Sequence, residues 1–134
     1  MIRNTAAVIA GIVAAFLTIM LVEKLGHVFY PPPLGLDFSD AEAIRPYLAN
    51  LPLGSFLFIM ASSIAGGFFG ILVACAISTV KPAAFAVVIG GIVLAASTAN
   101  FILIPHPLWL SLVTLVGIVA SAWLAMVLAT KLRG

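Results

Sequence analysis

The sequence predicts an all-α fold: an antiparallel four-helix transmembrane bundle with a short extramembrane helix between spans 1 and 2. Four long apolar stretches take up nearly all of the 134 residues. Hydrophobic residues make up 64% of the chain and charged residues only 7%, and the mean hydropathy is +1.32. Soluble domains carry about 25% charged residues, so this chain cannot coat a water-soluble surface and needs lipid as its solvent. We expect a single integral membrane domain over residues 1–134.

The spans follow from the thickness of the bilayer. About 20 apolar residues in a helix cross a hydrocarbon core of roughly 30 Å. Four stretches reach this length, and we expect spans at about 4–25, 53–80, 83–104 and 108–131. The first is interpreted as an uncleaved helix, because Glu23 and Lys24 follow it in place of the small residues of a cleavage site.

The insert at residues 31–52 is the one substantial segment expected outside the membrane. Three prolines from Pro31 onward end the first helix. Ser39 and Glu42 have the spacing of a capping box, which predicts a short helix beginning there. Four apolar residues then share one side of that helix: Ala41, Ile44, Tyr47 and Leu48. The helix should lie flat on the mouth of the bundle, kinked or shortened by Pro46.

Basic residues predict how the bundle is oriented. The links at 81–82 and 105–107 are short, so consecutive spans should be antiparallel neighbours. One side of the membrane then carries four basic residues: Arg3, Lys81, Lys131 and Arg133. The other side carries two basic residues and all four acidic ones: Lys24, Arg45, Glu23, Asp37, Asp40 and Glu42. The positive-inside rule predicts that both termini are cytoplasmic and that the insert is outside.

Small residues recur every four positions on two of the spans. They are Ser62, Gly66, Gly70 and Ala74 on the second span, and Gly117, Ser121 and Ala125 on the fourth. Gly66 and Gly70 form a GxxxG pair. Small residues let helix backbones approach closely in a membrane. Two interpretations stay open: the stripes seal the bundle internally, or they hold a second copy or a larger partner.

Polar residues gather near the predicted outer face. Glu23 and His27 are four residues apart and share one helix face, and Asn100 and His106 should lie at the same end. Ionisable residues at membrane depth mark functional sites by default. These four residues predict a site for a proton, a metal ion, a lipid headgroup or a quinone head. The alternative is that Glu23 and Lys24 are simply solvated helix ends.

Other chemistry finds little support in the sequence. Cys75 is the single cysteine, which excludes a dithiol relay. Glu23, His27 and His106 would make a three-ligand metal set only if the turns converge, so no metal site is assigned. The chain has no phosphate loop, HExxH or CxxC motif, and no cofactor is identified. An enzyme is therefore not the favoured interpretation.

A combination of four motifs is distinctive. They are Glu23-x-x-x-His27, Tyr30-Pro31-Pro32-Pro33, Leu51-Pro52-Leu53-Gly54 and Ile104-Pro105-His106-Pro107-Leu108-Trp109. Over essentially the whole chain this pattern resembles a family of small, four-span bacterial inner-membrane proteins. The resemblance implies the fold and a location in the bacterial inner (plasma) membrane. Small multidrug-resistance exporters also carry a first-helix glutamate, but theirs lies at the middle of the membrane.

The leading functional prediction is an accessory or scaffold subunit that packs against a larger membrane complex. It rests on the small soluble portion, the GxxxG stripe and the absence of a catalytic set. The expected partners are membrane lipids and either further copies of the chain or a larger complex. The net charge of +2 is small and dispersed, which argues against nucleic acid. The alternative is a binder of a small molecule, lipid or quinone, or a proton-coupled transporter, using Glu23, His27, Asn100 and His106.

Overall fold

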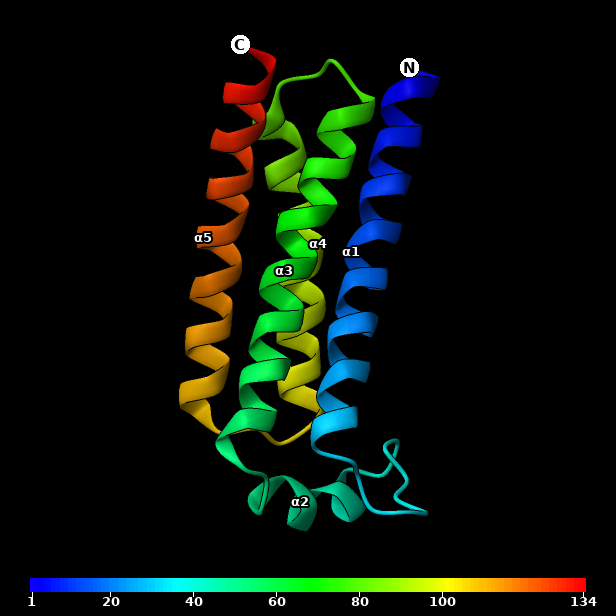
Figure 1. Ribbon diagram of the computed structural model, residues 1–134, viewed down its shortest axis with the longest axis vertical. Helices are drawn as coiled ribbons and strands as arrows, with labels where there is room; N and C mark the ends of the chain where they lie inside the picture. The colour runs from blue at the N-terminus through cyan, green and yellow to red at the C-terminus, as the bar shows by residue number, and fades with distance from the viewer.

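Five helices make up the fold in the computed structural model, which describes residues 1–134 (Figure 1). Four are long and apolar enough to cross a membrane: α1 (Ile2–Phe29), α3 (Leu53–Ile77), α4 (Pro82–Leu103) and α5 (Leu108–Arg133). The fifth, α2 (Ala41–Ala49), lies across one end of the bundle. The predicted all-α four-helix bundle is confirmed, and the chain is a multi-pass integral membrane protein.

The two ends of the bundle differ in what they carry. Both termini and the α3–α4 link lie at one end, which we call the terminal end (Figure 1). Helix α2 and the α4–α5 link, residues 104–107, lie at the other, which we call the α2 end. Successive spans therefore run in opposite directions, as short links require.

The first span is longer than predicted. It was expected to end near residue 25 but continues to Phe29, because no helix breaker occurs before Pro31. Tyr30 is the last residue to join it, and its N–H donates to the Gly26 carbonyl at 2.8 Å. A residue before proline avoids the helical region. Glu23 and His27 consequently lie on regular helix rather than at a frayed end.

The second span is shorter than predicted. It ends at Ile77 instead of residue 80, where Ser78 turns the chain and its Oγ accepts the Val80 N–H at 3.1 Å. The bounds of α4 and α5 agree with the predicted spans to within two residues.

Asp40, not Ser39, caps α2, so the predicted capping box was wrong. The Asp40 carboxylate accepts the N–H groups of Glu42 at 3.1 Å and Ala43 at 3.4 Å. Ser39 instead donates its hydroxyl to Asp37 at 2.6 Å, and this bond lowers the pKa of Asp37. Aspartate is as good an N-cap as serine, and it stands one residue closer to the helix.

The apolar side of α2 faces the bundle. Ile44 and Leu48 are buried, while Ala41 and Tyr47 are half-buried, as the sequence pattern predicts. Pro46 lies within the helix but does not end it, because α2 continues to Ala49.

Helix α3 is the centre of the bundle, and its glycines let α1 approach closely. A Cβ on Gly70 would lie 2.7 Å from the Gly11 carbonyl oxygen, and one on Gly66 would lie 2.9 Å from that of Ala15. Such distances leave no room for a side chain. The small-residue face of α3, which includes buried Ser62 and Ala74, is therefore covered within the chain.

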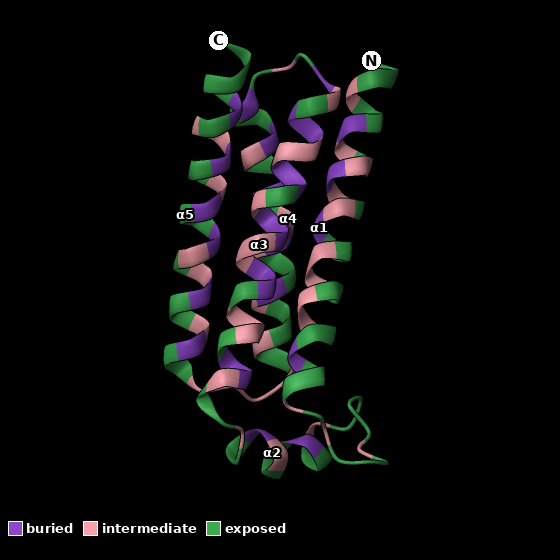
Figure 2. Ribbon diagram, in the orientation of Figure 1, coloured by how far each residue is buried: buried purple, intermediate pink, exposed green.

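The small residues of α5 also pack inward. Ser121 and Ala125 are buried, and the Ile64 side chain of α3 lies against Gly117. Buried positions occur along the whole length of the bundle (Figure 2). The largest buried apolar cluster lies toward the terminal end and comprises Ala7, Ile71, Ala74, Cys75, Phe85, Ile89, Ala125 and Ala129. Both stripes therefore contribute to the interior of this bundle.

Two arginines from other helices satisfy the carboxyl end of α3. Arg133 donates to the carbonyls of Cys75 at 2.6 Å, Ser78 and Val80. Arg3 donates to the Ile77 carbonyl at 2.5 Å. The last carbonyls of a helix have no partner within it, and cations there also complement the helix dipole. The two ends of the chain are thereby fixed to its central helix.

We expect Gly70→Ala to be less stable than Gly91→Ala by about 1–3 kcal/mol, the usual cost of overpacking. A Cβ on Gly91 would meet nothing within 4 Å, so this control has the same change in helix propensity without the collision. Reversible unfolding in mixed micelles, followed by circular dichroism, measures the difference. Equal stabilities would show that α1 does not approach α3 this closely.

Asp40→Ala is expected to destabilise α2 by about 1 kcal/mol, because two N–H groups lose their acceptor. Ser39→Ala, one residue earlier, should leave α2 almost unchanged. Hydrogen exchange of the α2 amides reports on each variant. Faster exchange in Ser39→Ala than in Asp40→Ala would restore serine as the cap.

Candidate functional site

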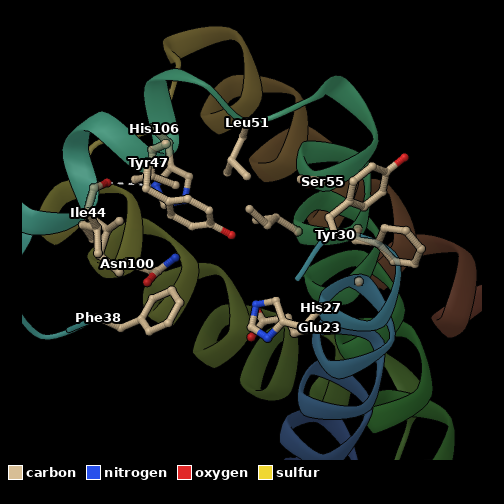
Figure 3. Close-up of a pocket in the computed structure, with 15 residues that line it drawn as sticks. Glu23, His27, Tyr30, Phe38, Ile44, Tyr47, Leu51, Ser55, Asn100 and His106 are labelled. Atoms are coloured by element: carbon tan, nitrogen blue, oxygen red, sulfur yellow. Dashed lines mark hydrogen bonds between the residues drawn. The ribbon is translucent and has the colours of Figure 1, made fainter. Parts of the chain in front are cut away.

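A cavity of about 180 Å³ lies at the α2 end, between α1, α3 and α4 and beneath α2 (Figure 3). Its polar lining residues are Glu23, His27, Tyr30, Tyr47, Ser55, Asn100 and His106. The rest of the wall is mainly apolar or aromatic. All four residues singled out from the sequence, Glu23, His27, Asn100 and His106, line this one cavity.

Helix α1 supplies Glu23 and His27 from one face. Its Gly26 permits this end of α1 to lie on α3, since a Cβ there would be 2.9 Å from the Phe58 Cβ. The Glu23 carboxyl group lies 3.4 Å from the buried Ser62 hydroxyl, which also donates to the Ile59 carbonyl at the shorter distance of 2.7 Å. Glu23 is half-buried whereas Lys24 is exposed. The two are thus not an equivalent pair of solvated helix ends.

The insert reaches back over α1 through aromatic contacts. The Phe38 ring stacks on His27 with centroids 6.2 Å apart, and it meets Tyr47 edge to face at 6.3 Å. Tyr47 projects from α2 toward the cavity (Figure 3). Partial burial raises the pKa of Tyr47, so its hydroxyl stays protonated at neutral pH and can donate or accept.

The motifs containing Tyr30 and Gly54 meet at one edge of the cavity. The Tyr30 ring lies against Gly54 so closely that a Cβ there would collide with it. Tyr30 also contacts Phe58 edge to face, with centroids 6.2 Å apart. This contact fixes the start of the insert against the start of α3.

His106 has a defined tautomer. Its Nδ1 lies 2.8 Å from the Ile104 carbonyl oxygen, and a carbonyl can only accept, so the Nδ1 carries the proton and Nε2 is an acceptor. Burial lowers the pKa of His106, although the bond to Ile104 opposes this. The ring is therefore neutral at pH 7. Phe101 packs edge-on against it at 5.1 Å.

Asn100 points from α4 into the same space (Figure 3). Its side chain is exposed. The neighbouring Thr98 behaves as an ordinary helix hydroxyl and donates to the Leu94 carbonyl at 2.7 Å. Asn100 is thus available to a ligand, and Thr98 is not.

Ser55 is a lining residue that the sequence analysis missed. It is only 8% exposed, and its hydroxyl has no hydrogen-bond partner. Leaving a buried hydroxyl unsatisfied costs about 1–3 kcal/mol. The available signal was its spacing, because Ser55 precedes Ser62 by two helical turns and shares its face. Thr114 on α5 also lacks a partner but lies outside the cavity.

The polar groups of the cavity can donate and accept hydrogen bonds. Glu23, His27 and His106 share the cavity, but no three histidine, cysteine, aspartate or glutamate side chains come together as metal ligands. Beyond Ser62, a contact between the Ser63 and Ser97 hydroxyls at 3.3 Å follows. The core then becomes apolar toward the terminal end. Comparisons with protein-family models, curated proteins and solved structures find no match to this chain.

The lowered pKa of His106 predicts a loss of stability in mild acid. As the pH falls below 6.5, the ordinary histidine value, the unfolded chain takes up a proton before the folded chain does. The free energy of unfolding should therefore decrease between pH 6.5 and the lower pKa of folded His106. Unfolding at several pH values measures this decrease, and ¹⁵N NMR reports the tautomer.

His106→Asn is the matched control, because its amide can still donate to Ile104 but does not titrate. The decrease should be smaller in this variant. An identical pH dependence in both proteins would mean that His106 does not contribute to it.

Proposed function

We propose that this chain is a membrane-embedded binding protein whose cavity holds one small amphipathic molecule. The observation that carries the proposal is the convergence of polar side chains from three separate segments. Glu23 and His27 come from α1, Asn100 from α4 and His106 from the link between α4 and α5. A mainly apolar wall with a few convergent polar groups is typical of a small-molecule site.

The size of the cavity limits the ligand. An engineered cavity of about 150 Å³ accommodates benzene, so the 180 Å³ here suits one ring or a polar head of similar volume. The unsatisfied hydroxyl of Ser55 and the free Nε2 of His106 offer that head hydrogen bonds. A longer apolar tail would have to remain outside, in lipid.

A lateral route from the bilayer fits the packing of the helices. Helix α1 packs mainly on α3 and touches α4 little. Asn100 is exposed on the α4 side of the cavity. A molecule dissolved in the membrane could therefore enter between α1 and α4 without displacing α2.

Binding is favoured over transport by the apolar half of the core. Ile71, Phe85 and Ile89 are buried between the cavity and the terminal end, and they offer no polar path for a proton or solute. From the distribution of basic residues we infer that the α2 end faces outward from a bacterial inner membrane. The cavity would then serve the outer leaflet.

The accessory-subunit function stays a prediction. One of its three grounds was the GxxxG stripe, and packing within the chain already accounts for the small residues: Gly66 and Gly70 lie against α1, and Gly117 lies against Ile64. No other surface feature favours a particular partner. The binding function is therefore the one that the geometry supports best.

Native mass spectrometry of the protein, gently extracted from its own membrane, tests the proposal. The unchanged chain should retain a small molecule at one copy per chain. Asn100→Leu combined with Ser55→Ala should lose most of it, because the ligand loses two hydrogen-bonding partners. Thr98→Val is the matched control, since it removes a hydroxyl from the same helix outside the cavity.

Two outcomes would contradict the proposal. One is a bare chain with no retained mass. The other is equal retention by the cavity variant and the Thr98→Val control. A stoichiometric larger protein in place of a small molecule would support the accessory-subunit prediction.

A further inference from the structure

The cavity contains one carboxyl side chain and no lysine or arginine. Glu23 is the only aspartate or glutamate in its lining, which includes no lysine or arginine. The single salt bridge of the chain joins Glu42 to Arg45 at 3.3 Å on the exposed side of α2. Glu23 therefore lies beside the Ser62 hydroxyl and shares the cavity with His27, but it has no lysine or arginine partner.

Aromatic rings surround the same space. Tyr30, Phe38, Tyr47 and Phe58 all line the cavity. They form two edge-to-face pairs, Phe38 with Tyr47 and Tyr30 with Phe58. The faces of aromatic rings attract cations, and several rings together bind quaternary ammonium groups. The wall thus combines a carboxylate with the kind of surface that accepts an organic cation.

The two histidines do not oppose a positive ligand strongly. His106 presents its unprotonated Nε2 to a ligand, because Nδ1 is committed to Ile104. His27 has an exposed side chain, so water and salt screen any charge on it. An anion, by contrast, would meet Glu23 with no lysine or arginine in the cavity to offset the repulsion.

We propose, on the basis of the proposed function, that the ligand is a small organic cation: an ammonium group carrying apolar substituents. Glu23 is its counter-ion, and Phe38 and Tyr47 form walls of its cage. Ionising a carboxyl group away from water is costly, and a bound cation lowers that cost. Ionisable residues at membrane depth commonly act as ligand counter-ions. The volume of 180 Å³ admits one such group with small substituents.

A pair of probes with the same shape isolates the charge. Benzyltrimethylammonium carries a positive nitrogen, and neopentylbenzene has a carbon atom in its place. Both are titrated into the full chain in lipid nanodiscs while NMR signals of the His27 and His106 rings are followed. A separate partition measurement determines the concentration of each probe in the nanodisc lipid. The cation should bind at least tenfold more tightly than its neutral counterpart.

Variants of two glutamates test the counter-ion. Glu23→Gln should bring the ratio of the two dissociation constants close to one. Glu42→Gln is the matched control, because it makes the same chemical change on an exposed residue outside the cavity, and it should keep the preference. Attraction of the cation to the nanodisc surface is common to both variants. Circular dichroism confirms that each variant is folded.

The outcomes separate this inference from the proposed function. Equal affinities for the two probes would overturn the inference that the ligand is an organic cation, but the cavity would still be a binding site. A retained native molecule without a positive charge would do the same. Failure of both probes, together with a bare chain in native mass spectrometry, would overturn the inference and the proposed function alike. An unchanged preference in Glu23→Gln would remove Glu23 as the counter-ion and overturn the inference.

The same experiment identifies the source of the cation. In nanodiscs of phosphatidylglycerol alone, no lipid carries an ammonium group and the probe binds freely. When phosphatidylcholine is added, a weaker affinity for the probe would assign the site to a lipid headgroup. An unchanged affinity would assign it to a free organic cation. Both results support the proposed chemistry.

Discussion

The close contact between α1 and α3 is the constraint on which the rest of the structure depends. Lipid offers helices little hydrophobic drive to associate, so association relies on close packing. Gly11 and Gly70 supply it where the backbones come nearest. Toward the α2 end, Gly26 continues the contact by lying against Phe58. This geometry brings Glu23 within hydrogen-bonding distance of Ser62. One wall of the cavity is thus a consequence of how two helices pack.

The free N–H and carbonyl groups at the helix ends are bonded by different kinds of side chain at the two ends of the bundle. At the terminal end, Arg3 and Arg133 donate to carbonyls near the end of α3, which joins both ends of the chain to the central helix. At the α2 end, Asp40 caps the short helix, and aromatic contacts through Phe38 hold the insert in place. The terminal end is therefore closed by charged hydrogen bonds. The α2 end is covered by side chains of α2 and the insert, and the cavity lies beneath them.

Much of the fold could be predicted from the sequence because hydropathy and chain length are local properties. The four spans, the short helix and the shared location of Glu23 and His106 follow from these alone. The remaining features depend on contacts between distant residues. Nothing near Arg133 in the sequence indicates that it reaches the end of α3. Whether Ser55 lacks a partner likewise depends on what three other helices leave open. The α2 cap was missed for a local reason, since two good capping residues are adjacent.

Two departures from good packing occur in the same place, and this argues that the cavity is more than a defect. A buried hydroxyl without a partner lowers stability, and a half-buried carboxyl group with no lysine or arginine beside it is costly to ionise. Ser55 and Glu23 show these departures in the wall of one cavity. Thr114 shows that an isolated unsatisfied hydroxyl also occurs elsewhere, so Ser55 alone would carry little weight. The location of Ser55 in the same cavity as Glu23 and the aromatic rings is stronger evidence for a binding site. Sequences tend to depart from consistent packing at functional sites, and an ammonium head that carries an N–H would both pair with the Glu23 carboxylate and donate to the Ser55 hydroxyl oxygen.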